Sequence, residues 1–343
     1  MSHHYPLLGL GLALGLYASP SVADFAHFQA LPQAVQQPAD NPSSAEKIRL
    51  GRKLFFDPAL LGADSRLSCN SCHNLATAGV DGKAVSHGQH GRHTYRSTPT
   101  LWNIGFQTVL YWDGRSPSLE AQALDHLRDP VISDNAHLGA MVQRLYDSAD
   151  YRRAFAAAFP GEDAVSADNV ARALASFQRS LLSPDSPFDR YIRGDEDALS
   201  ARAKRGMRLF NDSGCVSCHF GVNFAGPAPG PAMGPGDGFY ELFPNHLGSQ
   251  YDSQYRLADD LGRFEATGNL WEKHLWRMPI LRNIAETAPY FHNGRVKTLD
   301  EAVRVMAKTQ LRLEFSEAEV QDIVAFLRSL TGRMTLPAEG AGD

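Results

Sequence analysis

The sequence has few cysteines, no long hydrophobic run and no strong net charge. Its 343 residues include four cysteines and carry a formal net charge of −5, with 43% hydrophobic and 21% charged residues. The mild negative charge argues against nucleic acid or an anionic membrane surface as a partner, because both attract basic proteins. No stretch approaches about 18 uninterrupted apolar residues, so we expect no membrane span in the mature chain. The length allows two compact domains.

The N-terminus has the pattern of an export signal, except that positive charge is missing from its start. Residues 7–17 form an apolar run too short to span a bilayer, and residues 21–23 are small enough for cleavage. The first residues include His3 and His4 but no Lys or Arg, which leaves an uncleaved anchor as the alternative. We expect residues 1–23 to be a signal peptide and the protein to be periplasmic or otherwise exported.

The cysteines form two copies of a C-x-x-C-H motif: Cys69, Cys72 and His73, and Cys215, Cys218 and His219. This spacing is the attachment signature of c-type haem. Two thiols three residues apart can each form a thioether with a vinyl group of the porphyrin, and the histidine can bind the iron. A zinc site or a redox dithiol also begins with C-x-x-C, but neither needs the adjacent histidine twice. We expect two covalently bound haem c groups.

A sequence repeat precedes the two motifs. Residues 49–57 and 204–212 share Gly, Leu, Phe and Asp at the same offsets, and each stretch is predicted to form a short helix. The first has Ser43 and Glu46 in capping-box positions. The sequence therefore predicts a mainly α fold with two cytochrome c-like haem domains and long irregular loops. We place the N-terminal domain at residues 24–185 and the C-terminal domain at residues 186–343.

Other segments have clear patterns. Apolar periodicity predicts helices over residues 166–182 and 316–331, the second with Ser316 and Glu319 as a capping box. Glycine and proline keep residues 226–238 from being helical throughout. We expect residues 183–200 to connect the domains and the tail after Gly332 to be disordered.

The second ligand of each iron decides between electron transfer and chemistry, because only an open or displaceable position binds peroxide. Spacing alone does not choose among the candidates for the second haem, which are Met233, Met278, Met306 and His292. A glycine-rich loop after the first motif contains His87, His90 and His93. These histidines can reach the first iron or can belong to an ordinary polar loop.

The sequence resembles the bacterial dihaem cytochrome c peroxidases and the related MauG-type enzymes. The similarity runs from about residue 46 to residue 332, and the segments that carry it are residues 54–57, 68–74, 79–82, 99–100, 111–115, 214–222 and 281–294. The resemblance implies a low-potential, peroxide-reacting haem in the N-terminal domain. It implies a high-potential haem that receives electrons in the C-terminal domain.

The resemblance also implies roles for single residues. Trp112 lies in the Trp-Asp-Gly segment and is implied as the electron relay between the haems; the alternative is a buried packing aromatic. Met306 falls where the peroxidases have the axial methionine of the C-terminal haem and MauG-type enzymes have a tyrosine. Gln122 corresponds to a polar residue on the distal side of the peroxide-reacting haem.

Three positions depart from the peroxidase pattern. Gln89, flanked by His87 and His90, stands where the family usually has a displaceable histidine ligand. Ser97 stands where an asparagine commonly binds calcium between the domains, so calcium is doubtful but stays open. Ile132 occupies the third position.

Ile132 stands where the family has a distal glutamate that moves the proton during peroxide cleavage. A positioned acid or base contributes about 10²–10⁴-fold to such a step, and isoleucine cannot replace it. The candidates for a substitute are Asp134 and a histidine of the loop at residues 87–93.

Three functions follow as hypotheses. The first is an exported dihaem peroxidase that reduces hydrogen peroxide with electrons from a small cytochrome c or cupredoxin, with activity below the family norm or directed at a special substrate. The second is a MauG-like enzyme that modifies tryptophan or tyrosine of a partner protein; the missing glutamate permits it and Met306 argues against it. The third is a non-enzymatic dihaem electron carrier. The resemblance is also compatible with a homodimer.

Overall fold

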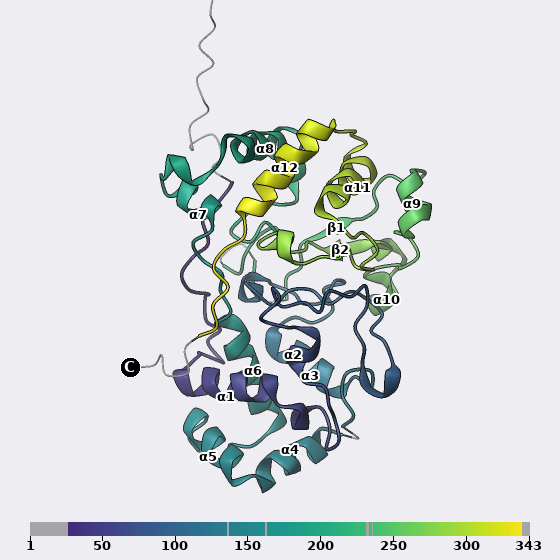
Figure 1. Cartoon of the computed structure of the whole chain (residues 1–343). Coiled ribbons are helices and arrows are strands. Elements are labelled where there is room, and N and C mark those ends of the chain that lie inside the picture. Colours follow the sequence, from purple (N-terminus) through teal and green to yellow (C-terminus); the bar gives the residue numbers. More distant parts are fainter. Residues whose placement is uncertain (1–26, 136, 162, 231–232, 235, 338–343) are drawn as a thin grey trace, which may run out of the picture.

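The fold consists of two helical lobes joined by long loops (Figure 1). The computed structural model describes residues 27–135, 137–161, 163–230, 233–234 and 236–337, so the predicted signal peptide lies outside the described residues. The mainly α prediction is confirmed. None of the helices in these ranges is long and apolar enough to cross a membrane.

The elements follow one another in a simple order. The α-helices are α1 (Ala45–Phe56), α2 (Cys69–Cys72), α3 (Leu119–Arg128), α4 (Leu138–Asp147), α5 (Ala149–Ala158), α6 (Ala167–Arg179), α7 (Pro187–Ile192), α8 (Ala201–Asp212), α9 (Gln250–Tyr255), α10 (Phe264–Thr267), α11 (Leu299–Leu311) and α12 (Glu317–Ser329). Two short strands, β1 (Tyr240–Leu242) and β2 (Leu275–Arg277), pair antiparallel with Tyr240 opposite Arg277. Short 3₁₀ turns, among them Ile104–Phe106 and Ile284–Glu286, lie between them.

Glycine in the sequence repeat brings one helix pair together in each lobe. A Cβ added to Gly51 in α1 would lie 2.0 Å from the carbonyl oxygen of Ala173 in α6. A Cβ added to Gly206 in α8 would lie 1.8 Å from the carbonyl oxygen of Asp322 in α12. Only glycine allows such a close backbone approach. The repeat is therefore a packing signature: the helix before each haem motif lies directly on a second helix.

Each lobe has its own hydrophobic core. The N-terminal lobe buries apolar residues between Leu50 and Leu181, from α1 and α3 to α6. The C-terminal lobe buries residues between Phe188 and Leu330, from α7, α8, α11 and α12. Phe188 and Phe326 pack edge to face there, with ring centroids 6.0 Å apart.

Both ends of the described chain cross between the lobes. Phe28 belongs to the core of the C-terminal lobe, although it precedes the N-terminal lobe in sequence. Met334 and Leu336 pack against the N-terminal lobe, and the Arg333 N–H donates to Pro184 O at 2.9 Å. Figure 1 shows the purple segment before α1 and the yellow segment after α12 running from one lobe to the other. The expectation of a disordered tail is wrong for residues 333–337, because apolar side chains anchor it.

Two local expectations also need correction. The N-cap of α1 is Ser44, whose side chain accepts the Lys47 N–H, so the expected capping box of Ser43 and Glu46 is not formed. Residues 187–192 form α7 inside the C-terminal core instead of a plain connection. The helices predicted over 166–182 and 316–331 are present as α6 and α12, and the Ser316–Glu319 capping box is formed.

A second repeat, which the sequence analysis missed, leads into α3 and α11. Asn103 and Asn283 have left-handed φ values of 64° and 61°, and the side-chain amides of both donate to the Ser183 hydroxyl at 2.8 Å. Tyr111 and Phe291 have φ values of 69° and 67°, each directly after a residue that forms a β-bridge. Each copy then continues into its helix. The two haem lobes thus share this loop as well as the helix before each haem motif.

Candidate haem sites

The two C-x-x-C-H motifs have the donor geometry that haem attachment requires. Among the described residues all four cysteines are free. The Nδ1 atom of His73 lies 3.1 Å from Pro99 O, and that of His219 lies 3.1 Å from Phe224 O. A backbone carbonyl that holds Nδ1–H fixes the tautomer and leaves Nε2 for a metal. These residues fit two covalently bound haem groups.

Burial favours the neutral forms of the histidines and cysteines of the two motifs. It lowers the pKa of His219 to about 4, against the opposing effect of the Phe224 carbonyl. Burial also lowers the pKa of His73, against the Gly79 and Pro99 carbonyls. Burial, with Cys72 close by, raises the pKa of the Cys69 thiol to about 12. Neutral imidazole is the form that binds iron.

The second motif opens into a large apolar cavity of the C-terminal lobe. Its volume is about 1290 Å³, including the open mouth, and Cys215, Cys218 and His219 form part of the wall. Met306 in α11 lines the same cavity, as do Met278 and His292. His292 stacks on Trp276 with centroids 4.2 Å apart, and its buried Nε2 has no hydrogen-bond partner. A flat, mostly apolar group with polar edges suits this space.

Trp112 lies between the two motifs. Its side chain lines the cavity of the C-terminal lobe and also a smaller pocket between the lobes, of about 500 Å³. Its Nε1–H donates to Ser97 O at 2.8 Å, and two residues on, Pro99 O lies 3.1 Å from His73 Nδ1. A short covalent and hydrogen-bonded path therefore links His73 to an indole at the wall of the other cavity.

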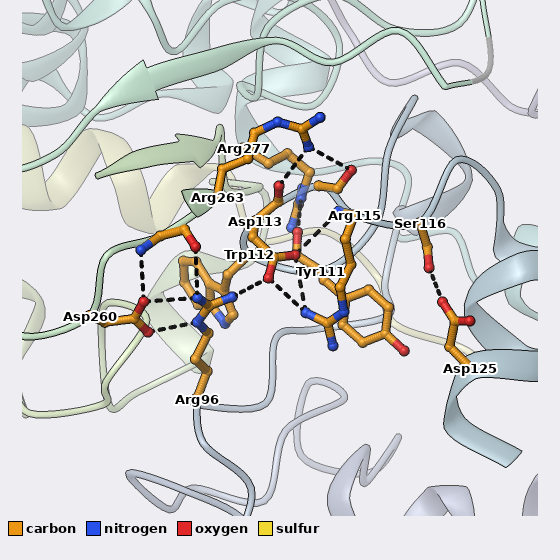
Figure 2. Close-up of polar contacts among 12 residues, drawn as sticks. Arg96, Tyr111, Trp112, Asp113, Arg115, Ser116, Asp125, Asp260, Arg263 and Arg277 are labelled. Carbon is orange, nitrogen blue, oxygen red and sulfur yellow. Dashed lines mark hydrogen bonds and ion pairs between the residues drawn. The ribbon is translucent and has the colours of Figure 1, made fainter. Parts of the chain in front are cut away.

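Buried charges hold the Trp112 segment in place (Figure 2). Arg96 donates to both carboxylate oxygens of Asp260, at 2.7 and 2.8 Å, and to Asp113 Oδ2 at 2.5 Å. The Arg277 N–H donates to Trp112 O at 2.9 Å, which ties the segment to β2. Burial would raise the pKa of Asp260, but the Arg96 guanidinium outweighs it and lowers the pKa. The network joins a loop of the N-terminal lobe to the C-terminal lobe.

The loop that carries the predicted histidine ligands lies beside the first motif, and its histidines contact other protein groups. The Cys72 thiol lies 4.0 Å from His87 O, and the His87 ring packs edge-on against His93 at 4.7 Å. His90 pairs with Asp134 at 2.9 Å, with both side chains about half exposed. The roles predicted for His87, His90 and Asp134 stay predictions, and the structure places the Asp134 carboxylate at the surface.

The other departures from the family pattern are also located. Ile132 is partly buried against the N-terminal core, and its carbonyl accepts the Gln89 amide at 3.3 Å. Ser97 lines the pocket between the lobes. Among the described residues, no three His, Cys, Asp or Glu side chains cluster to hold a metal ion. A calcium site at Ser97 stays open.

The sequence analysis missed His126, which lies one turn after Gln122 in α3. The amide nitrogen of Gln122 is 2.7 Å from its Nδ1, and the Tyr111 hydroxyl is 2.6 Å from the same atom. The Tyr111 and His126 rings stack at 5.2 Å. Burial first, and then the His73 imidazole and Arg115, lower the pKa of His126 to about 3. The signal in sequence was the i, i+4 spacing from Gln122.

Comparisons with known proteins agree with this geometry. A family model described as di-haem cytochrome c peroxidase matches residues 45–197, and one described as cytochrome c matches residues 203–331. The cytochrome c551 peroxidase of Pseudomonas aeruginosa is 38% identical over 335 residues, covering 95% of this chain and 92% of that protein. The methylamine utilization protein MauG of Methylophilus methylotrophus is 32% identical over 318 residues, covering 88% and 87%. A solved MauG-like protein associated with microbial copper homeostasis has a TM-score of 0.73 at 31% identity, covering 88% of this chain and 95% of that one.

Proposed function

Because this chain belongs to the dihaem cytochrome c peroxidase family, we propose that it reduces hydrogen peroxide to water with electrons from a redox partner. The bound haems would supply the electron storage and the iron that binds peroxide. The reaction balances as H₂O₂ + 2 e⁻ + 2 H⁺ → 2 H₂O. The single observation that carries the proposal, beyond family membership, is the position of Trp112 between the two haem sites.

The chain's own residues would have three tasks. His73 and His219, oriented by the Pro99 and Phe224 carbonyls, hold the two irons. Met306 would be the second ligand of the haem held by His219. Thioether ligation raises the reduction potential, which suits this haem to receive electrons. Trp112, fixed through Ser97 O, relays electrons toward His73.

The partner and the location belong to the same proposal. The donor would be a small c-type cytochrome or a cupredoxin that reaches the C-terminal lobe, where Met306 and the second motif share one cavity. The protein would act after export, in the periplasm or an equivalent compartment. Two copies can associate as a homodimer, which gel filtration with light scattering would measure directly.

Steady-state turnover tests the function. Reduced cytochrome c is mixed with the dihaem protein, and its oxidation is followed with and without hydrogen peroxide. We expect peroxide-dependent oxidation that falls by 10-fold or more in Trp112→Phe, because phenylalanine fills the space but is harder to oxidise. Trp271→Phe is the matched control, since Trp271 is 92% exposed and far less constrained. Oxidation no faster than with free haem would refute the proposal.

A MauG-like activity is the second candidate, and the observation that favours it is Ile132. This side chain packs with the N-terminal core and offers no acid for peroxide cleavage. Oxidising equivalents stored on the haems would then be used to modify a partner's tryptophan or tyrosine. Mass spectrometry of a co-expressed partner after peroxide treatment separates the two, because only this activity adds oxygen or a cross-link to the partner.

A further inference from the structure

His126 and Met306 occupy equivalent positions in the two copies of the repeat that leads into α3 and α11. Residues 101–119 and 281–299 share Leu, Asn, Ile, Gly and Arg at a constant separation, and each copy ends in a hydroxyl N-cap, Ser118 or Thr298. His126 and Met306 each lie seven positions after the first helical residue, Leu119 or Leu299. Identical helix starts and equal offsets put the two side chains at equivalent places in their lobes.

The equivalence extends to what each helix faces. In the C-terminal lobe Met306 lies in the cavity wall together with His219 of the haem motif. In the N-terminal lobe the His73 imidazole of the other motif is, after burial, one of the causes that lower the pKa of His126, which puts His126 in the same part of the lobe as that motif. The repeat therefore predicts that His126 faces His73 in the way that Met306 shares a cavity with His219.

The contacts of His126 are those of a supported metal ligand. The close polar contacts gather at Nδ1, with the Tyr111 hydroxyl at 2.6 Å, whereas the nearest polar atom to Nε2 is the Gln122 amide at 3.2 Å. A ligating histidine typically engages one ring nitrogen with an outer partner and binds the metal through the other. Tyr111 is itself held in a left-handed conformation (φ 69°) that bulky residues rarely adopt. The Arg115 guanidinium carbon lies over the Tyr111 ring, 3.4 Å from its centroid.

We propose that His126 is the second axial ligand of the N-terminal haem, on the face opposite His73. The inference rests on the two-haem part of the proposed function but not on peroxidase activity. It gives the N-terminal iron two histidines and the C-terminal iron a histidine and a methionine, a pairing that separates their reduction potentials in the direction the proposed electron flow needs. The loop histidines His87 and His90 are then not required at the iron.

The proposal has a quantitative consequence for ligand binding. An external ligand must displace His126, which is carried by a helix and not by a mobile loop. If His126 is bound in about 99% of molecules, the apparent Kd of an external ligand rises about 100-fold. Removing the imidazole should restore the tighter affinity. Slow or weak reaction with peroxide follows from the same competition.

Spectroscopy of the oxidised holoprotein tests the proposal without reference to turnover. Electron spin resonance of the wild-type protein should show both haems low-spin. In His126→Ala one of the two haems should become high-spin, its apparent Kd for cyanide should fall by about 10-fold or more, and added imidazole should restore the low-spin signal. His126→Met, which keeps a ligand at the position, should stay low-spin and guards against a folding defect in His126→Ala. Haem content of two per chain is verified in each variant.

Control variants make the result specific. His87→Ala and His90→Ala should leave both low-spin signals unchanged, and Met306→Ala should convert the other haem. A high-spin N-terminal haem in the wild-type protein would overturn the proposal, as would a spin change caused by His87→Ala or His90→Ala. An unchanged spectrum in His126→Ala would do the same. Loss of peroxidase turnover with the expected spectra would refute the proposed function and leave the ligand assignment standing.

Discussion

The Arg96→Ala substitution should weaken the protein more than any exposed charge change, because it removes the central cation of a buried network. The Arg96, Asp113 and Asp260 side chains are 10%, 3% and 8% exposed. After the substitution Asp113 keeps Arg115, which donates to it at 2.8 Å, but Asp260 keeps only the Gly262 N–H. Removing one partner of a buried ion pair typically costs about 3–5 kcal/mol, and we expect a loss in this range.

Chemical denaturation of the holoprotein, followed by circular dichroism, measures the free energy of unfolding. Arg256→Ala is the matched control, because Arg256 pairs with Asp259 where both side chains are more than half exposed, and exposed pairs contribute about 0–1 kcal/mol. In the double variant Arg96→Ala/Asp260→Asn the second change removes the stranded carboxylate. Its total loss should therefore be smaller than the sum of the two single losses. Additive losses, or a loss for Arg96→Ala no larger than the control, would refute the argument that Asp260 depends on Arg96.

Three further predictions follow from single contacts. Gly206→Ala should destabilise the C-terminal lobe by at least about 1–3 kcal/mol, because its Cβ would overlap the Asp322 carbonyl, whereas Gly139→Ala on the exposed face of α4 should change the thermal midpoint little. Met306→Ala should lower the reduction potential of one haem and leave the other unchanged in a spectroelectrochemical titration, and equal shifts in both would contradict its assignment. The pKa of Asp260 lies below its unfolded value, so its contribution to stability is present above about pH 4 and is lost as the pH falls further. Asp260→Asn should therefore flatten the plot of unfolding free energy against pH below about pH 4. An unchanged plot would count against the pairing with Arg96.

Local signals in the sequence were sufficient for much of the architecture. Apolar periodicity located α6 and α12, and the Gly-Leu-Phe-Asp repeat located α1 and α8 in front of the two motifs. These features depend on neighbours within a few residues, which a linear pattern records. The errors arose where distant segments meet: residues 333–337 are ordered by apolar contacts with the other lobe, and α7 belongs to a core.

The same division between local and distant signals applies to the residues of the haem sites. Attachment could be read from the chain, because Cys-x-x-Cys-His carries both thioether thiols and the first iron ligand within five residues. His126 could not, since its importance comes from contacts with Tyr111 and from its proximity to His73, far away in sequence. The sequence spacing to Ile132 suggests Asp134 as a proton donor, but only the fold shows that its carboxylate pairs with His90 at the surface.

The sequence by itself determined that this protein carries two c-type haems on a mainly helical chain, because the covalent chemistry and the helical periods are local. Only the tertiary structure decided which side chains from distant segments gather around each motif. The register of α3 and α11 depends on a loop repeat far from the motifs in sequence. Through it α11 places Met306 in the same cavity as His219, and α3 places His126 where the His73 imidazole affects its pKa.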